Sequence, residues 1–352
     1  MDSPENSGIP EEMLLQGARN AVTTCMAIGK GDRVTIISDR DTQRIGLALQ
    51  AECRRAGAEA EMTWLEDFGV RPYTTLPDNL ADALRATHPT ATFFAARGLK
   101  GEISFRIPLR HLLVDELKAR HAHMIDIDER LMVQGMLADY RVVAQVVERI
   151  TELVRTVREI RVTNPKGTDF RATFSRQLRW KPCTGIYHHQ GESGNLPEGE
   201  TFTCPDDAEG MLVAGVVGDY FSRKYGVLDR GVTFTVARGR VVDVGAENED
   251  LRQELKQYLA AGENSDRVGE FAIGANLWVK TLTGNLLQDE KIPGVHVAFG
   301  DPYPDETGAD WSAKTHVDVI PTDCTIVIDG RVLMRDGRFA PEALAGIKGL
   351  PE

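Results

Sequence analysis

The chain has few cysteines, and their spacing excludes several kinds of site. The five cysteines among its 352 residues are Cys25, Cys53, Cys183, Cys204 and Cys324. No two of them form a Cys-x-x-Cys pair, so the sequence carries neither a zinc-ribbon pattern nor the dense pairing of a disulfide-stapled domain. We therefore expect reduced thiols and a cytoplasmic location. The polar, acidic N-terminal sequence Met-Asp-Ser-Pro-Glu agrees, because a secretory signal has a basic and then an apolar region.

The chain also lacks an excess of positive charge and long apolar runs. It has 41 Lys and Arg against 53 Asp and Glu, a net charge of -12, so we expect no nucleic-acid partner. No apolar run reaches the roughly 20 residues of a membrane helix, so we expect no membrane partner. A nucleotide-binding loop is missing too, because the sequence Gly29-Lys30-Gly31 precedes the first expected strand, whereas a dinucleotide loop follows it.

The first half of the chain alternates strand-like and helix-like segments. We expect strands at residues 33–38, 60–65, 90–95 and 123–127, and helices at residues 41–56, 78–86 and 109–119. This alternation is typical of a parallel sheet of Rossmann type. A long apolar stripe at helical spacing over residues 128–156 follows and predicts a single helix, which suits a hinge between two domains.

The second half consists of short strands separated by turns. Strands are expected at residues 159–163 and 169–174, and a closing hairpin is expected to turn at Asp329-Gly330. We therefore expect an α/β protein with two domains. Residues 1–156 form an N-terminal Rossmann-like parallel-sheet domain, and residues 157–352 form a C-terminal mixed, strand-rich α+β domain.

Two histidines lie inside strand-like segments of the second half. His296 stands in Val-His-Val-Ala-Phe and His316 in Thr-His-Val-Asp-Val. Because residues i and i+2 of a strand point to the same face, His316 and Asp318 project together. An imidazole beside a carboxylate can hold a divalent metal. A lone histidine in a strand is more often a hydrogen-bonded core residue, so neighbouring groups have to decide between the two.

Two glutamates extend this group. Glu270 opens the apolar segment Phe-Ala-Ile-Gly, and Glu200 follows the sequence Asn-Leu-Pro-Glu-Gly at the start of another strand. Burying an unpaired charge among apolar neighbours costs several kcal/mol, and a shared metal ion would remove that cost. The cluster therefore favours a metal site, and the C-terminal domain is expected to bind metal. A metal-storing or scaffold protein without catalysis remains an alternative.

Several short sequence motifs surround these residues. They are residues 194–200 (Gly-Asn-Leu-Pro-Glu-Gly-Glu), Gly269-Glu270 with residues 273–276 (Ile-Gly-Ala-Asn), residues 294–300 (Gly-Val-His-Val-Ala-Phe-Gly), and residues 312–318 (Ser-x-x-x-His-x-Asp). Their order and spacing resemble those of the metalloaminopeptidases of the aminopeptidase T and aminopeptidase S type, the thermophilic metalloaminopeptidase family. The resemblance covers the C-terminal half well and the N-terminal half in outline.

The resemblance implies a set of metal ligands and a catalytic tyrosine. The implied ligands of two divalent ions are Glu200, Glu270, His296, His316 and Asp318. Zinc, cobalt and manganese all suit such nitrogen and oxygen donors. Tyr303, seven residues after His296, takes the place of the catalytic tyrosine, and Glu200 is expected to move a proton as well. Glu290 is expected to lie behind the ligands.

The residues His188 and His189 lie in the segment that leads into Glu200. A solvated loop pair is the simpler interpretation, but loops that precede a ligand motif carry functional residues often enough that we expect them to bind substrate. The implied substrate is a small peptide or a related amide, and the implied assembly is a homodimer.

The implied activity is hydrolysis of an N-terminal peptide or related amide bond by a metal-activated water. One alternative is a single-iron ring-cleaving dioxygenase of the 2,5-dihydroxypyridine type, which resembles this sequence in outline and keeps the His-x-Asp pair. Such enzymes hold one Fe(II) with two histidines and one carboxylate. Another alternative is a hydrolase of a non-peptide amide in a small-molecule pathway.

Overall fold

The computed structural model describes residues 8–218 and 220–351, which fold as two compact units. One unit contains the chain up to Arg141 and the segment Gly185–Glu198, and the other contains Val142–Thr184 and the chain from Gly199 onward. The change from the first unit to the second lies at Arg141, and the segment Gly185–Glu198 belongs to the first unit again. The expected domain boundary at residue 156 stays a prediction. Within the described ranges, no helix combines the length and apolar character needed to cross a bilayer.

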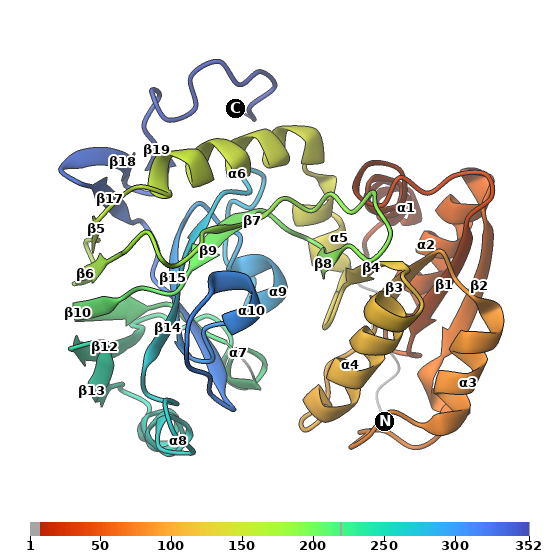
Figure 1. Ribbon diagram of the computed structural model, residues 1–352, viewed down its shortest axis with the longest axis horizontal. Helices are drawn as coiled ribbons and strands as arrows, with labels where there is room; N and C mark the ends of the chain where they lie inside the picture. The colour runs from red at the N-terminus through yellow and green to blue at the C-terminus, as the bar shows by residue number, and fades with distance from the viewer. Residues whose placement is uncertain (1–7, 219, 352) are drawn as a thin grey trace. The chain divides into compact units, whose positions relative to one another are not determined.

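The first unit is built on a five-stranded parallel sheet of order β2-β1-β3-β4-β8 (Figure 1). Its strands are β1 (Arg33–Ser38), β2 (Glu59–Trp64), β3 (Ala91–Ala95), β4 (Arg120–His123) and β8 (Ser193–Asn195). The sheet confirms the expected Rossmann-like architecture. All five residues of β3 are buried, as expected of a parallel strand with both faces covered. The fifth strand, β8, was not expected from the sequence.

The helices of the first unit connect these strands. They are α1 (Glu11–Arg19), α2 (Gln43–Arg55), α3 (Asp78–Thr87), α4 (Ile103–Arg110) and α5 (Glu129–Met132). Both α1 and α4 continue into wider π-helical turns, at Asn20–Cys25 and His111–Glu116. The single helix expected over residues 128–156 is wrong. It is interrupted after α5 by a short turn at Gly135–Leu137 and resumes as α6 (Tyr140–Val154).

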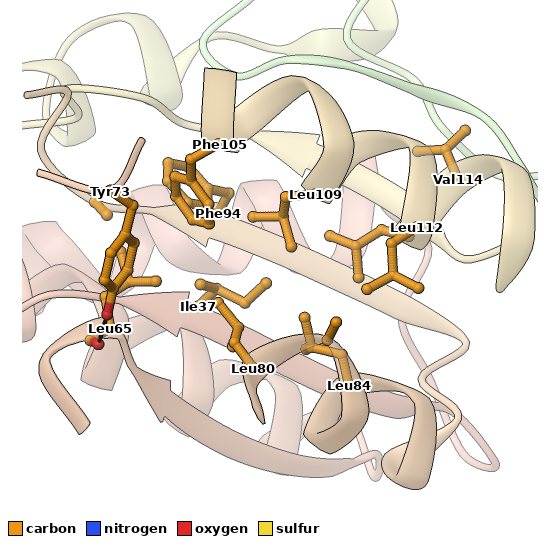
Figure 2. Packing of buried hydrophobic residues seen from close by; sticks show 13 residues of the cluster. Ile37, Leu65, Tyr73, Leu80, Leu84, Phe94, Phe105, Leu109, Leu112 and Val114 are labelled. Atoms are coloured by element: carbon orange, nitrogen blue, oxygen red, sulfur yellow. Dashed lines mark hydrogen bonds between the residues drawn. The ribbon is translucent and has the colours of Figure 1, made fainter. Parts of the chain in front are cut away.

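A compact apolar cluster joins α3 and α4 to the sheet of the first unit. Figure 2 shows Ile37 and Phe94 of the sheet pointing toward Leu80 of α3 and Phe105 of α4. The rings of Phe94 and Phe105 lie 6.3 Å apart. Because these side chains are almost completely buried, each contributes roughly 1.5–3 kcal/mol to folding by leaving water.

A buried ion-pair network lies beyond the carboxyl end of β1. Ligands of open parallel sheets bind at such ends where the strand order reverses, which in this sheet is between β1 and β3. Here Arg71 donates to Asp39 Oδ2 over 2.6 Å and to Glu102 Oε2 over 2.6 Å, and all three side chains are at most 7% exposed. The charges therefore satisfy one another, as buried charges must.

The second unit contains two antiparallel sheets. The eight-stranded sheet has the order β13-β12-β10-β6-β5-β17-β18-β19. Its strands are β5 (Glu159–Thr163), β6 (Asp169–Thr173), β10 (Asp207–Ala214), β12 (Val232–Ala237), β13 (Arg240–Gly245), β17 (Thr325–Ile328), β18 (Arg331–Arg335) and β19 (Arg338–Phe339). The expected hairpin between β17 and β18 is confirmed. Asp329 and Gly330 both have positive φ, at 43° and 82°, as a two-residue hairpin loop requires.

The second sheet of this unit has six strands in the order β11-β16-β15-β14-β9-β7. They are β7 (Lys181–Cys183), β9 (Glu200–Thr203), β11 (Val216–Val217), β14 (Val268–Gly274), β15 (Gly294–Gly300) and β16 (His316–Ile320). The helices of the second unit are α7 (Tyr220–Tyr225), α8 (Glu249–Leu259), α9 (Leu286–Asp289) and α10 (Pro304–Thr307), together with most of α6. The expected strand-rich α+β architecture of the C-terminal half is confirmed.

Candidate metal centre

The five predicted metal ligands lie on four neighbouring strands of the six-stranded sheet. Glu200 begins β9, Glu270 lies in β14, His296 lies in β15, and His316 and Asp318 lie in β16. Each adjacent pair among these strands, β9–β14, β14–β15 and β15–β16, is antiparallel. The sheet therefore gathers ligands from distant parts of the sequence without a dedicated metal-binding loop.

The strand register places these side chains on one face of the sheet. Glu270 and Asp318 stand on the two sides of Ala298, in one row across β14, β15 and β16. His296 precedes Ala298 by two residues on the same strand, so it points to the same face. The predicted pairing of His316 with Asp318 on one strand is confirmed by the bounds of β16.

Small residues stand opposite the remaining ligands. Glu200 pairs with Gly274, and His316 pairs with Gly300. Gly300 has a φ of 112°, and a Cβ there would lie 2.0 Å from the carbonyl oxygen of Thr315, so no larger residue fits without moving the backbone. A Cβ on Gly274 would likewise lie 2.0 Å from the carbonyl oxygen of Ile292, so the close approach of neighbouring backbone requires glycine at both positions.

The ligand atoms of the cluster have the spacing of a metal coordination shell. Nε2 of His296 lies 3.2 Å from Glu270 Oε1 and 3.4 Å from Glu200 Oε2. Nε2 of His316 lies 3.5 Å from Asp318 Oδ1 and 3.7 Å from Glu270 Oε2. Atoms that bind one ion at about 2.0–2.2 Å are themselves roughly 3–4 Å apart. The two oxygens of Glu270 therefore face different imidazoles at suitable distances.

Two atoms of the predicted ligand residues are buried without a hydrogen-bond partner among the described residues. They are Oε2 of Glu200, a residue that is only 6% exposed, and Nδ1 of His296. Buried polar atoms are nearly always paired, so an orphaned carboxylate oxygen needs an explanation. Glu200, Glu270 and His296 can place their donor atoms within 4.8 Å of one another, as can Glu290, His296 and Asp318. The residues present therefore fit a divalent ion.

The electrostatics of the cluster favour a bound cation. Burial lowers the pKa of His296, but Glu200, Glu270 and Asp318 outweigh it and raise this pKa to about 9. Burial also lowers the pKa of His316, which Asp318 and Glu270 then raise to about 10. Without a metal the imidazoles therefore hold protons as substitute cations. A divalent ion would displace those protons and take over their role.

Tyr303 lies beside the cluster in a strained backbone conformation. Its ring centre is 4.7 Å from that of His316 and 5.7 Å from that of Phe202. Its φ of 51° is unusual for an aromatic residue, and such conformations concentrate at functional sites. The side chain is 41% exposed. The protein packed around the phenol, followed by the charges of Glu270 and Asp318, raises its pKa well above the ordinary value.

A buried lysine at the edge of the cluster was not expected from the sequence. Nζ of Lys291 lies 2.6 Å from Glu200 Oε1 and 2.7 Å from Glu290 Oε1, and its side chain is fully buried. Burial raises the pKa of Glu290 to about 8, an effect that Lys291 opposes. The sequence carried a faint signal, because Lys291 directly follows an acidic residue just ahead of the strand with His296.

The histidines expected to bind substrate belong to the first unit, whereas the ligand cluster belongs to the second. Both side chains are exposed, and Nε2 of His188 lies 2.9 Å from the carbonyl oxygen of Thr24. The backbone N–H of His189 donates to Glu192. These contacts fix the loop locally, and a role for His188 and His189 in substrate binding stays a prediction.

A comparison with protein families identifies the family of the chain. The model of the thermophilic metalloprotease (M29) family matches residues 120–320. The chain belongs to this family. The matched range includes all five predicted ligands of the M29 family site and Tyr303. Membership confirms the expected family and the expected class of enzyme, a metal-dependent hydrolase.

Two solved structures share the fold over nearly the whole chain. AmpT from Thermus thermophilus has 17% sequence identity and a TM-score of 0.70, with 94% of this chain and 99% of that chain covered. A 2,5-dihydroxypyridine dioxygenase from Pseudomonas putida KT2440 has 18% identity and a TM-score of 0.68, with 95% and 99% covered. At these identities the two likenesses establish the fold, and they do not choose between the two activities. No curated protein matches the chain.

Proposed function

We propose that the chain is a metal-dependent aminopeptidase that cleaves an N-terminal peptide bond or a related amide bond of a small substrate. The observation that carries the proposal is the single sheet face with two histidines and three carboxylates at ligand spacing, in a member of a metalloprotease family. Zinc, cobalt and manganese all suit these donors.

The residues of the cluster would hold the ion and handle the protons. When bound, a divalent ion supplies a water of lowered pKa and polarises the carbonyl of the substrate. Glu200 has a carboxylate oxygen that no hydrogen bond occupies, so it can accept the proton of that water and pass it to the leaving amine. The phenol of Tyr303 is protonated at neutral pH, because an ordinary tyrosine has a pKa of about 10 and the surroundings raise the pKa of this one further. Its hydroxyl can therefore donate a hydrogen bond to the tetrahedral oxyanion.

Other features expected from the sequence stay predictions. They are the two-ion count, a homodimeric state, a cytoplasmic location, substrate contacts from His188 and His189, and the lack of nucleic-acid and membrane partners. The number of ions is separate from the nature of the reaction, because a single ion also generates a nucleophilic water.

A single-iron dioxygenase is the second candidate. His296, His316 and Asp318 supply two imidazoles and a carboxylate, the donor set of non-haem Fe(II) oxygenases. The fold shared with the Pseudomonas putida dioxygenase agrees with it. The additional buried carboxylates Glu200 and Glu270 favour the hydrolase, because an iron centre of this kind needs only one carboxylate.

An assay of the metal-depleted protein separates these candidates. The protein is dialysed against a chelator, restored with zinc, cobalt, manganese or iron(II), and given an aminoacyl p-nitroanilide and its N-acetylated counterpart. We expect hydrolysis of the free aminoacyl substrate with zinc, cobalt or manganese and none of the acetylated one. Oxygen uptake with a hydroxylated pyridine and Fe(II), without hydrolysis under any condition, would replace the hydrolase with the dioxygenase.

A further inference from the structure

The imidazole of His316 is held from outside the ligand cluster by the backbone of Asp301. Nδ1 of His316 lies 2.9 Å from the carbonyl oxygen of Asp301. A carbonyl oxygen can only accept, so Nδ1 carries the hydrogen of this bond. Nε2, which faces Asp318 and Glu270, is then the nitrogen that can bind a metal ion. The carbonyl of Asp301 therefore fixes the orientation of the ring and the nitrogen that the ring offers.

The carboxylate of the same residue holds the backbone of Tyr303. Its Oδ2 accepts from the N–H of Tyr303 over 3.3 Å, in the two-residue turn that aspartate side chains favour. Its Oδ1 accepts from the N–H of Ala313 over 3.1 Å. The carbonyl of Tyr303 accepts from the N–H groups of Glu306 and Thr307 over 3.0 and 2.9 Å. The backbone of Tyr303 is thus held on both sides in its unusual conformation, with a φ of 51°.

Asp301 is also tied to the strand that carries His316. Its N–H donates over 2.7 Å to the carbonyl of Thr315, the residue directly before His316. The residue before Asp301, Gly300, pairs with His316 in the sheet. Asp301 therefore contacts the ligand strand through its N–H and carbonyl, and Tyr303 through its carboxylate. One residue joins the metal ligand to the expected oxyanion donor.

We propose that Asp301 is a positioning residue, which holds the metal ligand His316 and the side chain of Tyr303 at a fixed distance from each other. The inference rests on the proposed metal-dependent function, in which His316 binds the ion and Tyr303 donates to the oxyanion. An oxyanion donor is effective only at about 2.7–3.1 Å from the developing charge, so a small shift of Tyr303 relative to the metal lowers kcat. The orientation of the ring of His316 affects the affinity for the metal.

Zinc affinity tests the contact with His316. Metal-free wild type and Asp301→Ala are equilibrated with Zn2+ across a dialysis membrane, and the bound zinc is measured by mass spectrometry. Without its carboxylate contacts, the turn no longer fixes the carbonyl that holds the ring. We therefore expect Asp301→Ala to bind zinc roughly 10–100-fold more weakly than the wild type. Asp301→Asn keeps one of the two acceptor oxygens, so its affinity is expected to lie between the two.

A second background tests the contact with Tyr303. At saturating zinc, we expect Asp301→Ala to lower kcat for an aminoacyl p-nitroanilide roughly 10–100-fold in the otherwise unchanged chain. In Tyr303→Phe the same change should lower kcat far less, because the hydroxyl that Asp301 positions is already missing. A general loss of stability would lower kcat by the same factor in both backgrounds.

Asp329→Ala is the matched control. The carboxylate of Asp329 also accepts from two backbone N–H groups, those of Arg158 and Glu159, but in the hairpin of β17 and β18. Its removal should leave zinc affinity and kcat unchanged.

Wild-type zinc affinity and kcat in a folded Asp301→Ala would overturn the assignment, as would an equal loss of kcat in the two backgrounds. If Asp301→Ala does not fold, wild-type values of both quantities in Asp301→Asn would overturn it as well. A wild type that binds zinc and cleaves no amide overturns the proposed aminopeptidase function alone, because the zinc affinities still decide on the role of Asp301.

Discussion

Glu270 and His296 face each other diagonally across two adjacent antiparallel strands, with 3.2 Å between Glu270 Oε1 and His296 Nε2. Glu270 pairs with Ala298, two residues beyond the histidine. The other oxygen of Glu270 lies 3.7 Å from His316 Nε2. One carboxylate thus connects the two imidazoles of the site, and Glu270 is the residue on which the geometry depends most.

Removing the side chain of Glu270 or of His316 should abolish metal binding. We expect Glu270→Ala and His316→Ala to lose metal binding and hydrolysis while the fold stays largely intact. Each change takes away one ligand, and the other ligands come from strands that the sheet holds in place. Elemental analysis, peptide hydrolysis and circular dichroism measure the three quantities. His111→Ala, an exposed histidine on a helical turn of the first unit, is the control. Full turnover in a variant lacking both ligands would show that the site is wrong.

The metal-free protein should become less stable as the pH rises. The pKa values of His296 and His316 are about 9 and 10 in the folded protein, above the roughly 6.5 of an unfolded histidine. Their stabilising charge is therefore fully present below about pH 6.5 and is lost as the pH rises through 9 and 10. We expect the melting temperature of chelator-treated protein to fall between pH 7 and pH 10.

Zinc-loaded protein provides the comparison for this pH effect. Its imidazoles are already deprotonated by the metal, so its melting temperature should change less over the same range. The affinity for zinc should rise with pH, because binding releases those protons. A melting temperature of the metal-free protein that stays constant or rises with pH would contradict the charge assignment.

Tyr303→Phe should reduce turnover without removing the metal. The ring keeps its packing against His316 and Phe202, and only the hydroxyl is lost. Loss of one hydrogen bond to an oxyanion typically lowers kcat by about 10²–10³-fold. Steady-state kinetics and metal analysis measure the two effects. The control is Tyr225→Phe, because the hydroxyl of Tyr225 donates to Glu254 in another part of the second unit. An unchanged kcat would remove Tyr303 from the mechanism.

Arg71→Ala should destabilise the first unit strongly. The change leaves the carboxylates of Asp39 and Glu102 buried without their shared cation, which typically costs about 3–5 kcal/mol. Arg85→Ala removes an ion pair with Glu116 that is about half exposed, so it should destabilise the protein far less, because water screens such a pair. Denaturant unfolding compares the two variants. Equal losses would mean that the buried network contributes no more than a surface pair.

The parallel sheet of the first unit could be predicted because its strands are local apolar runs. The expected strand at residues 33–38 coincides with β1 (Arg33–Ser38), and that at 60–65 is shifted by one residue from β2 (Glu59–Trp64). The strand β8 (Ser193–Asn195) could not be predicted, since it is three residues long and pairs with β4 from a distant part of the chain. The break in the helix expected over residues 128–156 was missed because its apolar spacing continues through Gly135.

The metal centre was predictable in its members and not in its arrangement. The pair His316 and Asp318 follows from the two-residue period of a strand. The register that brings Glu200 and Glu270 to the same face depends on pairing between strands, which the spacing along the chain does not contain. Lys291 was missed for the same reason: its contact with Glu200 joins two segments 91 residues apart.

The most direct test of the account is the identity of the metal in protein purified without added metal. Elemental analysis should find zinc, cobalt or manganese, and that metal should be lost in His316→Ala. Iron as the only metal would contradict the hydrolase and favour ring cleavage with oxygen. The absence of any divalent metal, with hydrolysis that survives chelation, would contradict a metal centre on this sheet face altogether.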